Sequence, residues 1–307
     1  MSRPLLLFVL GPTASGKSDL AVEIAVRSRS EIINCDSVQF FDGVDIGAAK
    51  PSHEQLTKVP HHLVGHVALG GEYTAGDFRR DAIKVIEPGA KNFLAVGGSG
   101  FYVQALEKGM YEVPKVPEVV RTKLEEEMEA TGPAPLHAEL TERDPEAAAR
   151  IQVNDRYRVL RALEILRASN DGRTLSQMRA EFEAAREPAP FRVAKMGLSV
   201  SRERLRERVT IRTQKMLSLG LIEEVKALRE RGFGNWGPLY SVGYKETQAY
   251  LEGSLSREEL EPAIITATMQ LAKRQMTWFK RDASIRWFDA EAEAERAIEF
   301  ALAQLAT

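Results

Sequence analysis

The chain has 307 residues, which is enough for two ordinary domains or for one large domain carrying an insertion. Hydrophobic residues make up 44% and charged residues 28%, so the composition argues against wholesale disorder, collagen-like repeats and coiled coils. The formal net charge of -2 does not by itself indicate a nucleic-acid-binding protein, although local basic patches remain compatible with one.

The first predicted element is a buried strand at residues 4–10, a nearly all-apolar run that ends at a glycine-rich turn. The run is far shorter than the roughly 20 residues that span a bilayer, and no cleavage site follows it. We therefore expect no membrane span, no signal peptide and a cytoplasmic location. Further strands are predicted at 32–35, 92–96 and 193–200, and helices at 18–29, 74–87 and 100–108. Strands that alternate with helices predict an α/β fold with a parallel sheet.

A helical insertion is predicted between two proline pairs, Pro114 with Pro117 and Pro188 with Pro190. Ala, Glu, Arg and Leu dominate this segment. We predict a core at 1–112 and 191–307, and an inserted all-helical domain at 113–190 with helices at 117–130, 145–151, 156–168 and 175–185. The chain after residue 200 is predicted to be mostly helical, at 202–218, 221–231 and 257–281.

Cysteine and histidine usage limits the metal chemistry. Cys35 is the only cysteine, which excludes an intrachain disulfide and a Cys-rich zinc site. Four of the five histidines lie within residues 53–66, but their spacing fits no standard metal-ligand pattern. Residues 202–215 carry six basic and two acidic side chains, which is typical of a solvated helix face or of a patch that binds RNA phosphates.

The strongest motif is GPTASGKS at residues 11–18, which matches the phosphate-loop (P-loop) pattern G-x-x-x-x-G-K-[ST] between a predicted strand and helix. Such a loop converges backbone amides on phosphate oxygens, Lys17 adds a charge, and Ser18 is suited to ligate Mg²⁺. The pattern predicts a P-loop NTPase-like core whose phosphate site comprises Gly11, Thr13, Ala14, Ser15, Gly16, Lys17 and Ser18. It does not say which phosphate compound is bound, so ATP binding is an assumption.

Two further strand ends carry polar groups. The second predicted strand ends at Asp36, whose carboxylate would share the carboxyl edge of the sheet with the phosphate loop. It would bind Mg²⁺, act as a general base or cap a turn. The strand at 92–96 ends in GGSG, which offers amides and the Ser99 hydroxyl but no Walker-B carboxylate.

Ten short motifs occur in order along nearly the whole chain: GPTASGKS, DSVQ (36–39), DIG (45–47), AKP (49–51), VPHHL (59–63), YTAGDFRRDA (73–82), GGSGFY (97–102), NDRYRVLRALE (154–164), VGY (242–244) and LAKRQMTW (271–278). With these motifs the sequence resembles the tRNA dimethylallyltransferases, also called isopentenyl-diphosphate:tRNA transferases. The resemblance implies transfer of a dimethylallyl group from dimethylallyl diphosphate to N6 of the adenine just 3′ of the anticodon. It also implies Mg²⁺ as cofactor and the tRNA anticodon stem-loop as partner, and we expect a monomer.

The resemblance assigns roles to particular residues. Asp36 is expected to be the general base, Ser99 to hydrogen-bond near the diphosphate and the amine, and Lys17 and Arg208 to bind the leaving group. The tRNA contacts that it implies are Asp36, Ser37, Val38, Gln39, Ser99, Arg121, Tyr157, Arg158, Arg161, Tyr240, Gly243 and Lys245.

Five positions depart from the family pattern: Ser99 replaces a usual threonine, Ala48 replaces a common threonine, Phe41-Asp42 replaces Tyr-Arg, and Met269 replaces a common arginine. Three other functions compete with the transferase. One is prenylation of free adenine nucleotides, for which no basic helical insertion is needed. The others are an ATP-dependent small-molecule kinase and a noncatalytic, nucleotide-switched RNA-binding module.

Overall fold

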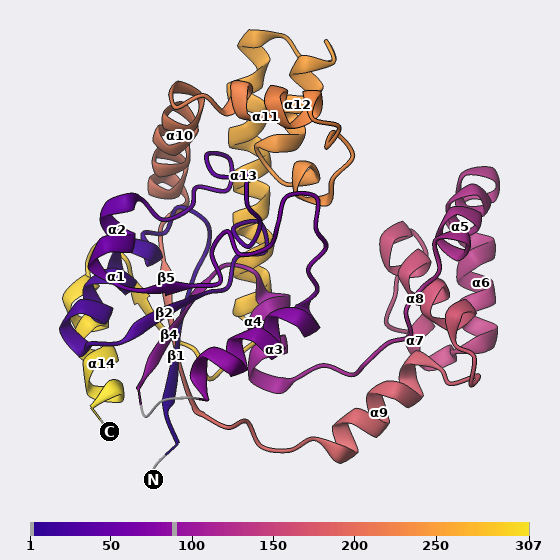
Figure 1. Ribbon diagram of the computed structural model, residues 1–307, viewed down its shortest axis with the longest axis horizontal. Helices are drawn as coiled ribbons and strands as arrows, with labels where there is room; N and C mark the ends of the chain where they lie inside the picture. Colours follow the sequence, from indigo (N-terminus) through magenta and orange to yellow (C-terminus); the bar gives the residue numbers. More distant parts are fainter. Residues whose placement is uncertain (1–2, 88–90, 307) are drawn as a thin grey trace. The chain divides into compact units, whose positions relative to one another are not determined.

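The computed structural model describes residues 3–87 and 91–306 and divides the chain into two compact units (Figure 1). Unit 1 comprises Met1–Lys108 and Ala189–Thr307, and unit 2 comprises Gly109–Pro188. Among the described residues, no helix combines the length and the apolar character needed to cross a bilayer.

Unit 1 is built on a six-stranded sheet whose neighbouring strands all pair in parallel. The strands lie in the order β3 (His61–His62), β2 (Glu31–Asn34), β4 (Phe93–Gly97), β1 (Leu5–Leu10), β5 (Arg192–Ser199) and β6 (Arg286–Asp289). The predicted parallel α/β class is confirmed. The two edge strands were not predicted, because β3 has only two residues and β6 buries only Phe288, so neither leaves a periodic pattern.

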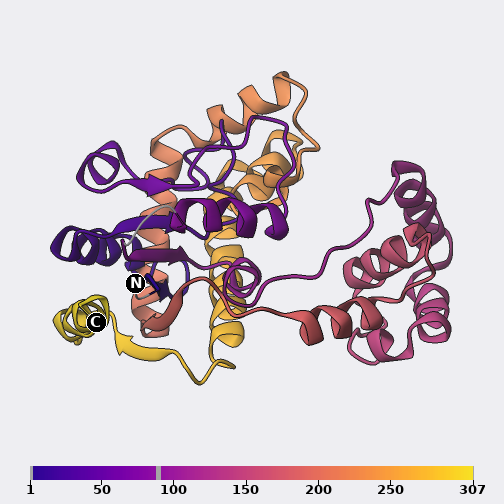
Figure 2. The same ribbon diagram turned by 60° about the horizontal axis from the view of Figure 1, so that its bottom comes forward.

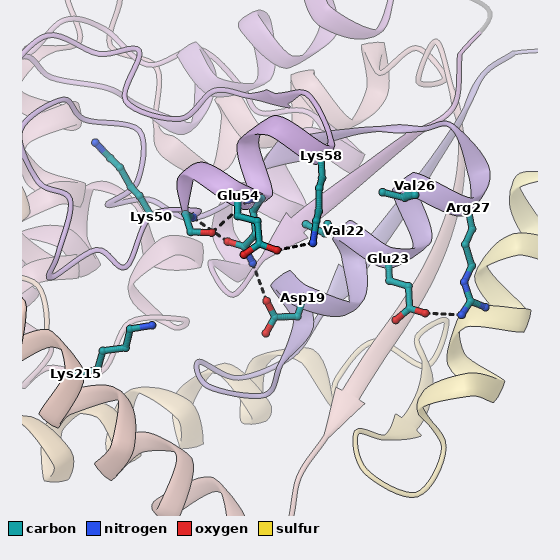
Figure 3. A pocket seen from close by; sticks show the side chains of 11 residues that line it. Asp19, Val22, Glu23, Val26, Arg27, Lys50, Glu54, Lys58 and Lys215 are labelled. Atoms are coloured by element: carbon teal, nitrogen blue, oxygen red, sulfur yellow. Dashed lines mark hydrogen bonds and ion pairs between the residues drawn. The ribbon is translucent and has the colours of Figure 1, made fainter.

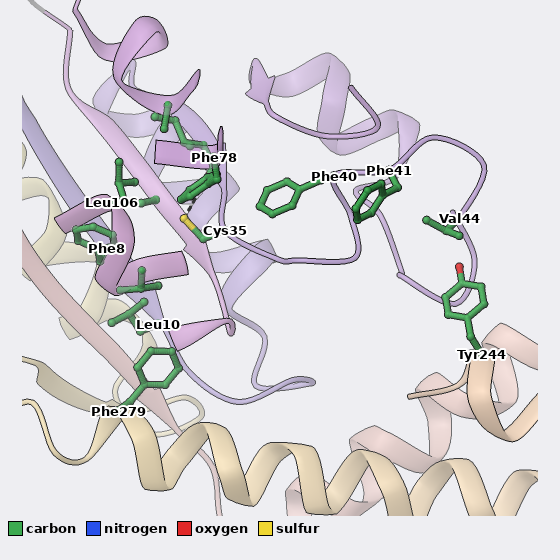
Figure 4. Packing of buried hydrophobic residues seen from close by; sticks show 14 of the residues in the cluster. Phe8, Leu10, Cys35, Phe40, Phe41, Val44, Phe78, Leu106, Tyr244 and Phe279 are labelled. Carbon is green, nitrogen blue, oxygen red and sulfur yellow. Dashed lines mark hydrogen bonds between the residues drawn. The ribbon is translucent and has the colours of Figure 1, made fainter. Parts of the chain in front are cut away.

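Helices cover both faces of the sheet, which explains why β1 is apolar throughout. Leu5, Leu7 and Val9 pack against α1 (Lys17–Ser28) and α14 (Ala294–Leu305). The alternate residues Leu6, Phe8 and Leu10 belong to a second cluster, which draws on α3 (Ala75–Ile86), α4 (Gly100–Lys108) and the end of α13 (Arg257–Phe279) (Figure 4). Because successive side chains of a strand point to opposite faces, one central strand supports both layers.

The remaining helices of unit 1 are α2 (His53–Lys58), α10 (Arg202–Ser218), α11 (Leu221–Glu230), the 3₁₀ helix η1 (Gly237–Tyr240) and α12 (Tyr244–Leu251). The helix α10 begins after Ser201, whose hydroxyl accepts a hydrogen bond from the Arg204 amide. It then packs along α13, with Leu205 and Val209 buried against Ile265 and Ala272. The helical character predicted after residue 200 is confirmed, apart from β6.

Unit 2 is all-helical and consists of α5 (Glu118–Thr131), α6 (Pro133–Arg143), α7 (Pro145–Ala148), α8 (Arg156–Ala168) and α9 (Leu175–Ala185) (Figure 2). It has a hydrophobic core of its own, which includes Leu124, Leu140, Val159 and Leu163. The helix α6 was not predicted. It begins with Pro133 at its first position, where a proline is tolerated because that amide needs no partner.

Candidate active site

The phosphate loop connects β1 to α1 at the carboxyl edge of the sheet. Gly16 precedes the helix with φ 89°, a conformation that favours glycine. Ala14, two positions earlier, also has a left-handed φ of 61°. Left-handed residues at alternate positions turn successive amides towards one concave side. The Ser15 hydroxyl is buried and has no hydrogen-bond partner among the described residues. The loop therefore has the shape and the spare donors of an anion site.

Three charged side chains converge on this loop. Burial lowers the pKa of the Lys17 ammonium to about 8, while the Asp36 carboxylate raises it and the Arg212 guanidinium lowers it further. Burial also lowers the pKa of Arg212, again against the effect of Asp36. Two cations thus lie close to one carboxylate beside the phosphate loop. Arg212 was not singled out from the sequence, although it lies four residues after Arg208, the spacing of one helix face.

The ends of β2 and β4 bring the remaining polar groups together. The strand β4 lies between β1 and β2, so the loop and Asp36 share an edge without being on adjacent strands. The Ser99 hydroxyl accepts a hydrogen bond from the Ser37 amide at 3.2 Å and donates to the Ser37 hydroxyl at 3.3 Å. Asp36 folds into its own turn, where its carboxylate accepts from the Val38 amide at 3.0 Å. Ser99 is therefore held directly beside the Asp36 turn.

Two side chains support the phosphate loop from distant helices. Arg208 on α10 donates to the Ser15 carbonyl at 2.9 Å and pairs with Glu291 at 3.1 Å. Gln275 on α13 accepts a hydrogen bond from the Thr13 amide at 2.8 Å, a contact across 262 positions of the chain. Nothing in the local sequence around Gln275 signals that contact.

A third supported segment is the loop at residues 45–48, in which three consecutive amides point at one carboxylate. The Glu224 carboxylate accepts hydrogen bonds from Asp45, Ile46 and Gly47 at 2.8–3.1 Å, and from the Tyr244 hydroxyl at 2.6 Å. The next carbonyls, of residues 48 and 49, accept from the Gln39 side chain. This network connects the segment 36–39 to the start of α12.

The predicted tRNA-contact residues of unit 1 lie at the ends of this network. Tyr240 is 57% exposed at the end of η1, and Gly243 adopts φ 94° immediately before α12. Lys245 is exposed in the first turn of that helix.

In unit 2 the predicted contact residues lie on α5 and α8, where all of them are exposed except the half-buried Arg161. Tyr157 is 78% exposed and Arg121 lies on an exposed position of α5. Arg158 pairs with Asp155 at 3.4 Å and Arg161 with Glu164 at 2.7 Å. Arg158 and Arg161 already have carboxylate partners, so a polyanion would have to compete with these ion pairs.

Three of the substituted family positions are buried or partly buried within unit 1. Met269 packs against the α10–α13 cluster, Phe41 lies edge-on to Trp236 with ring centroids 5.2 Å apart, and the Ala48 amide donates to the Tyr244 hydroxyl at 3.1 Å.

The clustered histidines have separate partners. His61 contacts the Val59 carbonyl at 2.8 Å, and His62 contacts Glu31 at 2.7 Å. Within residues 3–87 and 91–306 no group of three or more His, Cys, Asp or Glu side chains is arranged to hold a metal ion. The exposed Ser18 hydroxyl and the Asp36 carboxylate are oxygen donors near the phosphate loop.

A surface pocket lies elsewhere, between α1 and α2 (Figure 3). Charged side chains line it, and four of them form ion pairs, Lys58 with Glu54 and Arg27 with Glu23, while Gln55 donates a hydrogen bond to Asp19. Neither Asp36 nor Ser99 lines this pocket. We therefore assign the chemistry to the carboxyl edge of the sheet.

Comparisons with known proteins agree with the sequence motifs. A family model described as IPP transferase matches residues 39–282. A tRNA dimethylallyltransferase of Bdellovibrio bacteriovorus is 47% identical to this chain over 292 residues, which cover 94% of each protein. The crystal structure of the full-length tRNA isopentenylpyrophosphate transferase of Bacillus halodurans is similar with a TM-score of 0.70 at 31% identity, covering 99% of this chain and 98% of that one. A eukaryotic dimethylallyltransferase acting on tRNA is similar with a TM-score of 0.77 at 27% identity, over 95% and 75% of the two chains.

Proposed function

Because the chain belongs to the IPP transferase family and is an enzyme of tRNA prenylation, we propose how its own residues carry out the reaction. The enzyme transfers a dimethylallyl group from dimethylallyl diphosphate to N6 of the adenine 3′-adjacent to the anticodon, and diphosphate is released. The C1–O bond of the donor breaks, the N6–C1 bond forms, and one proton leaves N6.

The phosphate loop and its cations bind the leaving group. The amides that open α1, from residue 16 onwards, the Lys17 ammonium and the Arg212 guanidinium stabilise the negative charge that develops on the departing diphosphate. Burial of Lys17 strengthens its interaction with an anion, since the effective dielectric constant is lower there than in water. We assign Arg208 to the same end of the site, where it holds the Ser15 carbonyl and adds positive charge behind the loop.

The end of β2, beside the phosphate loop, supplies the group that activates the amine. The adenine N6 lone pair is delocalised into the ring, so proton removal by the Asp36 carboxylate assists its attack. Ser99, held 3.2 Å from the Ser37 amide, orients the amine or the donor oxygen through its hydroxyl. A serine retains this hydroxyl at a position where the family usually has threonine.

The residues beside the loop fit a Mg²⁺ ion that keeps water and phosphate ligands, since Ser18 and Asp36 offer hard oxygen donors. When bound, the ion would neutralise charge on the diphosphate oxygens.

Access to N6 requires the adenine to leave its stack and enter the protein. We propose that the segments 36–39 and 240–245 contact the anticodon loop and that Arg121, Tyr157, Arg158 and Arg161 contact the anticodon stem. We further propose that the enzyme works as a cytoplasmic monomer.

The observation that carries this proposal is the convergence of Lys17, Arg212 and Asp36 at the phosphate loop, with Ser99 beside the Asp36 turn. The test is a transfer assay with purified protein, radiolabelled dimethylallyl diphosphate and Mg²⁺. The acceptor is either an anticodon stem-loop that contains the target adenine or free AMP.

We expect label on the stem-loop alone. Label on AMP would move the acceptor to free adenine nucleotides. Absence of label on both acceptors, combined with ATP binding, would overturn prenyl transfer and favour a small-molecule kinase.

A further inference from the structure

The Gln275 carboxamide lies between two loops of the site. Its Oε1 accepts the hydrogen bond from the Thr13 amide at 2.8 Å. On its other side, Nε2 is so close to Gly98 that a Cβ there would lie 2.3 Å from it. Gly98 therefore provides the space that lets this side chain sit against the loop, and the side chain itself is partly buried.

This contact reduces the number of phosphate-loop amides that are free to bind an anion. Residue 12 is proline and has no N–H, so the first backbone amide after Gly11 belongs to Thr13. That amide is taken by Gln275, and the Ser15 amide donates to the Pro12 carbonyl at 3.2 Å. The amides that open α1, from residue 16 onwards, are the ones a helix N-terminus leaves without intrahelical partners. On the side of the loop next to β1, the Thr13 and Ser15 amides are therefore not available to bind an anion.

The Lys17 side chain also limits the space on this side of the loop. Its ammonium donates to the Pro12 carbonyl at 3.2 Å, so the side chain folds back over the first half of the loop. The structure therefore offers a compact anion site next to α1, and the neutral Gln275 carboxamide lies on the strand side of that site.

We propose that Gln275 is a specificity-determining residue: by occupying the Thr13 amide and the space against Gly98, it restricts the loop to two phosphoryl groups and excludes a third. The inference deepens the proposed function, on which it rests, since a prenyl diphosphate presents two phosphoryl groups and ATP presents three. A glutamine suits this role because its oxygen accepts from Thr13 without adding a negative charge beside a polyanion.

Calorimetric titration in MgCl₂ with inorganic diphosphate and with inorganic tripolyphosphate tests the proposal without reference to turnover. For the wild type we expect diphosphate to bind at least about tenfold more tightly, the difference made by one charge-assisted hydrogen bond gained or lost. Gln275→Ala frees the amide and the space, and should reduce this preference to about threefold or less.

Gln275→Glu should have the opposite effect. It keeps an acceptor for Thr13 and the same size, so the fold is retained, but its charge repels a third phosphoryl group most strongly. We expect the preference for diphosphate to increase by about threefold or more. Gln248→Ala is the matched control: it removes a buried glutamine that donates to the Leu239 carbonyl at 3.0 Å, and it should leave the preference unchanged.

An alanine variant that melts like the wild type and keeps the full preference would overturn the inference, and so would a wild type without any preference. If the alanine variant does not fold, a glutamate variant that weakens both ligands equally overturns it. A wild type that binds neither ligand and transfers no prenyl group would instead overturn the proposed function.

Discussion

The two units of the molecule treat their cations in different ways. In unit 1, Lys17 and Arg212 are held at the phosphate loop, where burial lowers the pKa of both. In unit 2, Arg158 is exposed and Arg161 is half-buried, and each is already paired with a nearby carboxylate: Asp155, which precedes α8, and Glu164 on α8. Buried cations interact strongly with an anion at a defined position, whereas exposed pairs exchange partners at low cost. Unit 1 is thus suited to a reacting group and unit 2 to a flexible polyanion.

The two units also differ in the side-chain contacts that connect distant segments. The phosphate loop is held by side chains from α10 and α13, far away in the sequence. In unit 2, the better-buried Arg167 bridges Glu139 and Glu127, whose hydrogen bonds raise its pKa, and it joins helices instead of presenting charge to a ligand. Arg158 and Arg161 do not join helices in this way, so they can exchange their carboxylate partners for phosphate groups.

The largest effect is expected at the base. Asp36→Asn preserves the turn with the Val38 amide but removes the proton acceptor, so turnover should fall by about 100-fold or more while tRNA binding is retained. Single-turnover transfer and a filter-binding assay measure the two quantities, with Asp42→Asn, an exposed loop carboxylate, as the control. Equal losses in binding and in turnover would contradict the assignment.

The next effect concerns Arg212, which is partly buried beside the phosphate loop. Arg212→Met removes the charge but keeps the packing volume, and should weaken binding of diphosphate and of dimethylallyl diphosphate by about 10-fold to 100-fold. Arg202→Met, at the exposed start of the same helix, should change neither affinity. Similar affinities for both variants, measured by calorimetry, would show that burial gives Arg212 no special role.

A pH profile sharpens the comparison further. Burial first, and Arg212 second, lower the pKa of Lys17 to about 8, so its charge is complete below that pH and is lost as the pH rises through it. Diphosphate affinity should therefore decrease above about pH 8, by at most about tenfold per unit. Lys17→Arg should remove this inflection, because a guanidinium stays protonated there. An identical inflection in that variant would assign it to another group.

The smallest effect is expected in unit 2. Replacement of Arg158 and Arg161 by glutamine should weaken tRNA binding by about threefold to tenfold at low salt and flatten its salt dependence. The affinity for dimethylallyl diphosphate should not change. Arg173→Gln is the control, since this exposed arginine of unit 2 is paired with Asp171 and Glu181. If the salt dependence of tRNA binding in the Arg158 and Arg161 variant equals that of the wild type, the proposed role of unit 2 is contradicted.

Several features could be predicted from the sequence because they depend on residues close together in the chain. The phosphate-loop pattern, the apolar strand before it and the helix after it specify one another over about 25 residues. The end of β2 at Asp36 and of β4 at GGSG follow from the same local patterns, and the ordered motifs lead to the family. Even the helices of unit 2, apart from α6, follow from composition and proline boundaries.

The tertiary structure alone decided which distant residues meet at the site. The edge strands β3 and β6 exist because neighbouring strands supply their hydrogen-bond partners, which no local periodicity reveals. Arg212 becomes a site residue only because α10 is packed along α13 beside the loop. Likewise, Gln275 reaches Thr13, and Glu224 reaches the amides of residues 45–47, only after folding has brought these segments together. A local pattern specifies how a segment folds, but burial and hydrogen bonding between segments determine what it touches.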